Sequence, residues 1–163
     1  MSEVKMYFDT DEELLKCLKK WKERLGLSDW LIACTLSDKE DMENDGEYEC
    51  AGYSEVQWVS KTGSIQILKK EYIPDDCLFK QPHEESLIHE LLHFKFLALE
   101  GKSREHIFYE TMQHQMLEEL ARAFFLAEYN LPNDWYYKDD VKSIKTLEQL
   151  KGTRLVTSPY TLV

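Results

Sequence analysis

Two histidines and a glutamate stand in the segment His89-Glu90-Leu91-Leu92-His93, at the spacing H-E-x-x-H. Residues four apart on an α-helix lie one turn apart along the axis and about 40° apart around it. Two imidazoles at that spacing can converge on one ion, and zinc is the metal that this pattern typically binds. Glu90 points about 100° away from His89, which suits a general base beside a metal-bound water. The sequence therefore predicts a zinc site with His89 and His93 as ligands and Glu90 as the catalytic residue.

The residues around this motif predict a buried helix from about 83 to 100, which Gly101 ends. Most of them are apolar, and a helix that is apolar on all sides is a buried one. An imidazole or carboxylate in such a helix usually has a partner or a metal. The context of the motif therefore supports a metal site over a chance match.

A catalytic zinc takes three protein ligands and keeps one position for water, so one more ligand must come from elsewhere in the chain. A second long helix is expected at about 104 to 129, with Ser103 as its N-cap. If it packs antiparallel to the first helix, the residues at the depth of His93 lie near 111 to 114, which favours His114. Glu118, one turn further, is either the alternative ligand or a carboxylate that orients a ligand. Glu110, one turn earlier, is a weaker third choice.

The other histidines and the second helix carry further expectations. His83 and His106 stand near predicted helix N-termini and are expected to be exposed rather than ligating. The core-facing stripe of the second helix is predicted from apolar residues at helical spacing. Its members are Phe108, Met112, Met116, Leu120, Phe124 and Ala127.

The chain before the motif predicts one helix and a small sheet. Thr10 and Glu13 form a capping box for a helix from about 11 to 25. Three strands are expected after it, at about 30–36, 52–59 and 64–69. The last of these strands is expected at an edge of the sheet, where an extended peptide could pair with it.

Length and composition predict an ordinary globular protein of one domain, residues 1–163, in which 133–163 is a C-terminal extension packing on the rest. The net charge of −11 argues against binding to nucleic acid or to an anionic membrane surface. No apolar run is long enough to span a bilayer, and the N-terminal residues lack the apolar core of a signal peptide. The four cysteines form no C-x-x-C pair. Together these features predict a cytoplasmic protein with reduced thiols.

Two other metal-binding patterns fit the sequence less well. The acidic residues from Asp41 to Gly46 imitate the start of an EF-hand loop, but the position of its bidentate glutamate is occupied by Gly52. Peptide deformylases combine H-E-x-x-H with an upstream cysteine ligand, and Cys50 stands at a comparable separation. The glycine-containing motif that surrounds that cysteine is absent around Cys50.

With these residues in view, the chain resembles the zincin superfamily of metallopeptidases, and within it the small proteins found in bacterial phages and mobile elements. The match consists of His89–His93 and, more loosely, the segment from His114 to Ala121 on the following helix. The H-x-x-G-x-x-H extension of the metzincins is missing after His93. The resemblance implies an α+β fold with an N-terminal helix, a small twisted sheet of about three strands, an active-site helix and a second long, ligand-bearing helix.

The resemblance further implies a zinc-dependent metallopeptidase-like hydrolase that acts on a peptide or protein substrate. Glu90 would accept the proton of the attacking water and pass it to the leaving amine. Tyr129 and Tyr136 are candidates for an added hydrogen-bond donor. The alternative is a non-catalytic protein of phage or mobile-element origin that keeps the zincin fold as a binding or regulatory module.

Overall fold

The computed structural model describes residues 4–42, 51–73, 80–96 and 107–137, with side chains described from Met112 onward in the last stretch. It contains α1 (Asp11–Arg24), β1 (Leu31–Ser37), β2 (Gly52–Gln57), β3 (Thr62–Leu68), α2 (His83–Phe96) and α3 (Ile107–Tyr129). Short 3₁₀ helices occur at η1 (Lys39–Asp41), η2 (Lys70–Tyr72) and η4 (Asn133–Tyr136). The α+β class and the order of helices and strands agree with the prediction from sequence.

The three strands form a mixed sheet in the order β1-β3-β2. β1 runs parallel to β3, and β2 pairs antiparallel with β3 through a hairpin. The strand that begins at Thr62 is therefore central, and the prediction that it lies at an edge is wrong. It takes the central place because it pairs in parallel with β1 on one side and in antiparallel with β2 on the other, so β1 and β2 are the edge strands.

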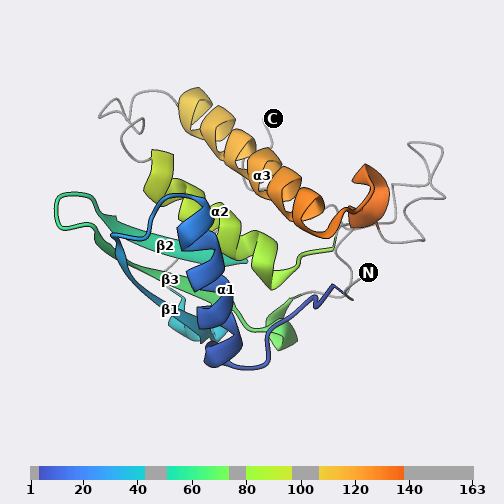
Figure 1. Cartoon of the computed structure of the whole chain (residues 1–163), viewed down its shortest axis with the longest axis horizontal. Helices are drawn as coiled ribbons and strands as arrows, with labels where there is room; N and C mark the ends of the chain where they lie inside the picture. Colours follow the sequence, from blue (N-terminus) through green and yellow to red (C-terminus); the bar gives the residue numbers. More distant parts are fainter. Residues whose placement is uncertain (1–3, 43–50, 74–79, 97–106, 138–163) are drawn as a thin grey trace.

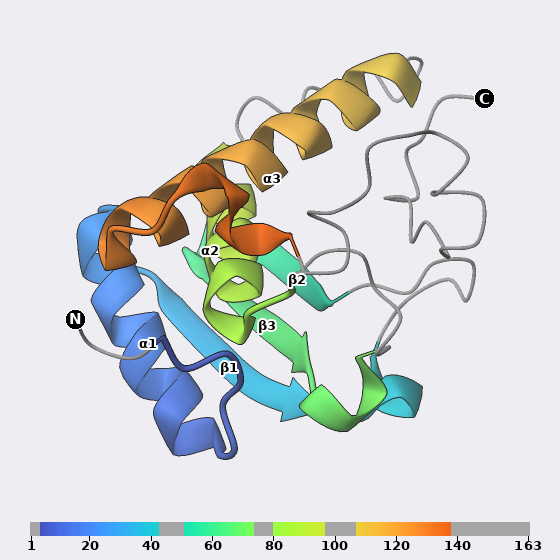
Figure 2. The ribbon, with the colours of Figure 1, turned by 90° about the vertical axis from the view of Figure 1, so that its right-hand side faces the viewer.

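The described helices lie on one face of the sheet, and α2 lies between the sheet and α3 (Figures 1 and 2). α2 contacts β2, β3, α1 and α3, so it is surrounded on most sides. As a result, all residues from Leu87 to Leu92 are buried. Gly63 allows the close approach of α2 to β3, since a Cβ atom there would lie 2.6 Å from a ring carbon of Phe94.

The N-terminal helix begins as the capping pattern predicts. The Oγ1 atom of Thr10 accepts a hydrogen bond from the backbone N–H of Glu13. The Glu13 carboxylate accepts in return from the N–H of Asp9, one residue before the expected donor. The helix ends at Arg24, and Gly26 takes the left-handed conformation with φ of 67°, as expected for a residue that follows a helix.

The buried face of α3 differs from the predicted stripe. Leu117, Ala121 and Phe125 are buried, whereas Met112 and Met116 are 54% and 42% exposed. Phe124 is 37% exposed and Ala127 is exposed as well. The prediction followed the apolar residues alone, but the face that packs against α2 also carries His114 and Glu118, so the stripe was placed on the neighbouring face.

The residues of the C-terminal extension that the structure describes pack on the core. Tyr136, in η4, is 2% exposed and belongs to the main hydrophobic cluster. Its ring lies 6.1 Å from that of Phe125 on α3. The amphipathic segment expected at 141–150 falls outside the described residues. No helix in the described part of the chain is long and apolar enough to cross a membrane.

Candidate metal centre

Two elements supply the candidate metal ligands, α2 with His89 and His93, and α3 with His114. One ring nitrogen from each of these three histidines lies within 4.8 Å of a ring nitrogen of the other two. The His114 ring centroid lies 4.6 Å from that of His89 and 5.6 Å from that of His93. The structure therefore brings the three predicted ligand residues together, although His114 follows His93 by 21 residues along the chain.

The distances within this group suit a metal ion. The Nε2 atoms of His89 and His93 lie 3.3 Å apart. Zinc bonds of about 2.0–2.1 Å in a tetrahedral arrangement place two ligand nitrogens about 3.3–3.4 Å from each other. A proton shared by the two rings could account for the same distance. A shared proton needs only two rings. The third imidazole, that of His114, lies beside both, and this favours a metal cation as the common partner.

Burial favours the neutral form of His89, the protonation state that a metal ligand needs. His89 is 8% exposed, and burial, followed by the charges of His114 and His93, lowers its pKa well below the usual value. Its Nδ1 atom is buried and has no hydrogen-bond partner among the described residues. A neutral imidazole is the form that coordinates a metal. The charges of the neighbouring histidines thus disfavour a proton on His89 and leave its ring nitrogens available to a metal ion.

Glu90 lies on the side of α2 that faces the edge strand β2. It is 6% exposed, and the hydroxyl of Ser54 donates a hydrogen bond of 2.6 Å to its Oε2 atom. Burial raises the pKa of Glu90, and the positive charge of His93 and the bond from Ser54 oppose that increase. The influence of His93 shows that the carboxylate lies within electrostatic reach of the histidine group. This is the arrangement expected of a base next to a metal site.

Glu118 lies outside the three-histidine group, on the next turn of α3 after His114. Burial raises its pKa, and the charge of Arg122 opposes the increase. Its own charge raises the pKa of Glu90 and contributes to the increase for Glu85, whose pKa reaches about 8 mainly because of burial. Of the two leading candidates for the third ligand, the geometry therefore favours His114, and Glu118 belongs to a polar cluster beside it.

That cluster continues along the interface of α2 and α3 away from the histidines. The Nε atom of Arg122 lies 3.7 Å from Glu85, which is one turn before His89. The guanidinium of Arg122 also lies over the ring of Tyr136, 4.8 Å from its centroid. Charged residues at this interface explain why α3 has a mixed face rather than a purely apolar one.

His83 occupies a buried position, which corrects the expectation that it is exposed. It is 1% exposed, and its Nδ1 atom accepts a hydrogen bond from the backbone N–H of Phe8. Its own backbone N–H donates to the carbonyl of Met6. Burial lowers the pKa of His83 to about 4. Its observed contacts therefore fasten the N-terminal segment to the start of α2.

Tyr129, one of the two tyrosines suggested as an added donor, is engaged elsewhere. The hydroxyl of Tyr129 donates to Glu84, five residues before His89. Glu84 is 3% exposed and also accepts hydrogen bonds from Lys20 and from the indole of Trp21. The prediction that Tyr129 serves the metal site does not match these contacts. Cys50 and His106, and the side chain of Glu110, fall outside the described residues.

The sequence gives no signal for Ser54 and Gly52, and only a weak one for Glu84. Ser54, Gly52 and Glu84 lie in a strand and in a helical turn whose residue types are unremarkable. Their roles depend on which residues the fold places opposite them. A charged residue within the predicted buried helix 83–100 was the only available clue, and it points to Glu84.

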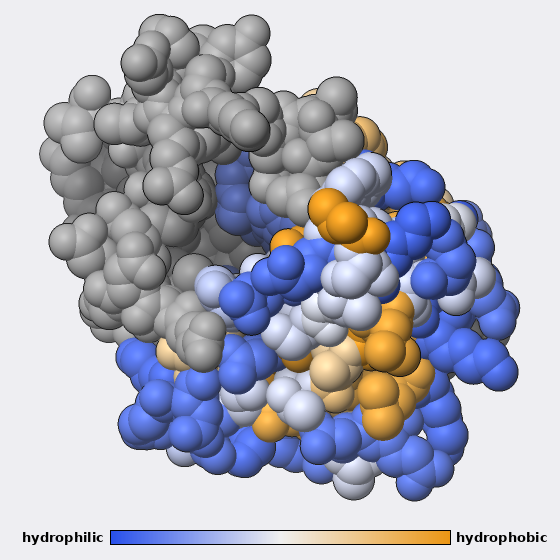
Figure 3. All heavy atoms as spheres, turned by 90° about the vertical axis from the view of Figure 1, so that its left-hand side faces the viewer, coloured by the Kyte–Doolittle hydropathy of each residue, from blue (hydrophilic) through white to orange (hydrophobic). Residues whose placement is uncertain are grey.

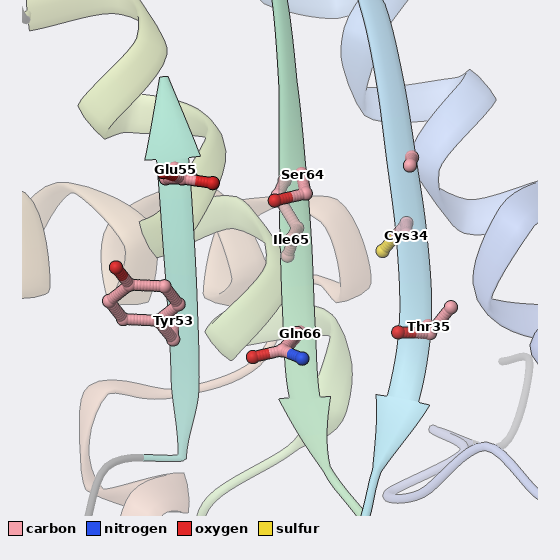
Figure 4. Close-up of a pocket in the computed structure, with 8 residues that line it drawn as sticks. Cys34, Thr35, Tyr53, Glu55, Ser64, Ile65 and Gln66 are labelled. Carbon is pink, nitrogen blue, oxygen red and sulfur yellow. The ribbon is translucent and has the colours of Figure 1, made fainter. Parts of the chain in front are cut away.

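The far face of the sheet carries a separate shallow pocket. It is lined by residues that include Thr35 on β1, Tyr53 and Glu55 on β2, and Gln66 on β3 (Figure 4). None of the metal-site residues contributes to it. The side chains there are mostly polar, and nothing in their arrangement resembles the histidine group.

A comparison with models of protein families found no match, and comparisons with curated proteins and with solved structures found none either. The function of the chain is therefore proposed from the geometry of its site.

Proposed function

We propose that this protein is a zinc-dependent hydrolase of the metallopeptidase type, with a zincin-like arrangement of its active-site helix. The observation that carries the proposal is the convergence of His89, His93 and His114, with Glu90 buried next to them. Three histidine ligands form the protein donor set of a catalytic zinc site, in which water takes the fourth position.

His89 and His93 from α2 and His114 from α3 would hold the ion. When bound, zinc lowers the pKa of water towards neutrality and polarises the carbonyl of the substrate. Glu90 would take the proton of the attacking water on a carboxylate oxygen and deliver it to the leaving amine. The burial of Glu90 raises its pKa, and this makes the carboxylate a stronger base than an exposed glutamate.

The peptide nature of the substrate is supported by the exposed position of β2 at the sheet edge nearest to Glu90. An edge strand offers backbone groups to which an extended chain can bind. The net charge of −11 would favour a basic peptide over an acidic one.

The first test is metal content. Protein produced with ample zinc and passed over a desalting column is expected to contain about one zinc per chain. His93→Ala is expected to lose it, because two imidazoles alone hold the ion weakly. The matched control is Gln115→Ala, an exposed position beside His114 on α3. Absence of bound metal in the wild-type protein would reject the proposal.

The second test separates a hydrolase from a binding module. Glu90→Gln is expected to keep the zinc and to lose hydrolysis by a factor of about 10²–10⁴, the usual contribution of a general base. Cleavage is measured by mass spectrometry on a mixture of synthetic peptides of varied sequence. A protein that binds zinc but cuts none of them would support the non-catalytic alternative. Cleavage at equal rates by wild type and Glu90→Gln would show that Glu90 is not the base.

A further inference from the structure

We propose that Ser54, together with Gly52, is a positioning residue that fixes the carboxylate of Glu90 against the edge strand β2. The inference rests on the proposed function and adds two residues to its machinery. Both belong to β2, and Ser54 precedes Glu90 by 36 residues in the sequence.

The first observation is the hydrogen bond from Ser54 to Glu90. The Oγ to Oε2 distance is 2.6 Å, which is the length of a hydrogen bond to an ionised carboxylate. Ser54 points to the helical side of the sheet, because its neighbours Tyr53 and Glu55 line the pocket on the opposite face (Figure 4). The bond therefore joins the sheet to α2, between a half-buried hydroxyl and a buried carboxylate.

The second observation is the close approach of Glu90 to Gly52. A Cβ atom at position 52 would lie 2.8 Å from Oε1 and 3.0 Å from Cγ of Glu90. These distances are too short for any side chain, so only glycine leaves room for the carboxylate in this position. Gly52 thus provides space on the same strand from which Ser54 provides the hydrogen bond.

Together the two contacts fix the orientation of a side chain that would otherwise rotate about three bonds. A base must lie within about 2.6–3.2 Å of the proton that it accepts, and small displacements lower the rate strongly. Ser54 occupies Oε2, which leaves Oε1 as the proton acceptor. β2 is suited to this role, because it is hydrogen-bonded to the central strand, with Ser54 paired to Ile65.

The test uses binding of a small probe to the zinc-loaded protein. Acetohydroxamate chelates zinc and gives up the proton of its hydroxyl group to a neighbouring carboxylate, so its affinity reports where that carboxylate lies. Its dissociation constant is measured by isothermal titration calorimetry, with zinc content determined on the same samples. The dissociation constant for Glu90→Gln shows how much affinity is lost when the proton acceptor is removed altogether.

Ser54→Ala is expected to weaken acetohydroxamate binding by about tenfold at unchanged zinc content, since the carboxylate loses a charge-assisted hydrogen bond. Ser54→Thr keeps the hydroxyl and is expected to restore affinity to within about twofold of wild type. Ser64→Ala is the matched control, because Ser64 lies on the far face of the neighbouring strand. Gly52→Ala gives an independent check and is expected to weaken binding by displacing Glu90.

The outcomes distinguish this inference from the proposed function. Wild-type protein without zinc would overturn the proposed function, and the inference with it. Zinc-loaded Ser54→Ala that binds the probe as tightly as wild type and as Ser64→Ala would overturn the positioning role and leave the metal site intact.

Discussion

His89 and His93 direct their Nε2 atoms to one point because they lie one turn apart on the same helix. His114 joins them only because α3 packs along α2, so its position depends on the register between two helices. Glu118, one turn further along α3, has a raised pKa and a charge that reaches Glu90. At the scale of single residues, zinc affinity should therefore depend on His114 more strongly than on Glu118.

Replacing His114 and Glu118 separately should give unequal losses of zinc affinity. His114→Ala removes one of three ligands, and affinity should fall by more than the factor of about 10–100 that is typical of an outer carboxylate. For Glu118→Ala, the loss of zinc affinity should stay within that factor. Competition with a chromophoric zinc chelator gives both values. A larger loss for Glu118→Ala than for His114→Ala would reverse the assignment, and full retention in both would reject both residues.

At the scale of elements, α2 is held at its first turn by a buried ionic network as well as by apolar packing. Glu84 accepts hydrogen bonds from Lys20 and Trp21 on α1 and from Tyr129 on α3. Lys20 and Arg24 in turn contact Glu128 on α3. One carboxylate thus links the three helices on one side of the sheet, less than two turns before His89.

Removing this carboxylate should destabilise the fold strongly. Glu84→Ala leaves the buried indole N–H of Trp21 and the half-buried hydroxyl of Tyr129 without their acceptor, and Lys20 keeps Glu128 alone. We therefore expect the free energy of unfolding to fall by about 3 kcal/mol. Urea denaturation followed by circular dichroism measures it. The matched control is Glu12→Ala, whose partner Lys16 is exposed and whose own side chain is 78% exposed. That control should lose less than about 1 kcal/mol, and an equal loss in both variants would contradict the proposed role of Glu84.

At the scale of the whole molecule, the described helices cover one face of the sheet, and the other face is polar. On the face seen in Figure 3, the coloured residues are largely hydrophilic, with a few apolar ones between them. Leu31 and Val59 are among the exposed large apolar residues of the described chain, at 75% and 99% exposed. The N-terminal segment is fastened to this body through His83, which links its position to the protonation of a buried imidazole.

The stability of the protein should therefore fall in mild acid. The pKa of His83 is lowered from 6.5 to about 4 by burial, although Glu71 and Asp9 oppose this. Below pH 6.5 the unfolded chain gains a proton at His83 that the folded protein does not bind, so the free energy of unfolding decreases as the pH falls to about 4. Above pH 6.5 both forms are neutral at this residue and the effect disappears.

His83→Asn offers the test, because an asparagine oxygen can accept the hydrogen bond from Phe8 without taking up a proton. Chemical denaturation of both proteins between pH 7 and pH 4, with a chelator present, compares their stabilities. As the pH falls, the free energy of unfolding should decrease less for the variant than for the wild type. Parallel curves would show that His83 does not contribute to the acid sensitivity.

Periodic and local features of this protein can be predicted from its sequence. The limits of α1 depend on the capping residues Thr10 and Glu13, and the pair His89 and His93 depends on helical spacing. Both are set by neighbours within a few residues. The distance of His114 from the interhelical turn was sufficient to favour it. In two antiparallel helices, residues at similar distances before and after the turn lie side by side.

Only the tertiary structure determines which residues lie opposite one another. The order β1-β3-β2 made β2 an edge strand, and so placed Ser54 and Gly52 against Glu90. The rotation of α3 buried Leu117 instead of Met116, because a face that carries His114 and Glu118 packs against α2. Such long-range pairing depends on packing between segments that are distant in the chain, and no local pattern encodes it. The sequence thus predicts the histidine pair and favours His114 as the third imidazole, and the fold determines the surroundings of the glutamate.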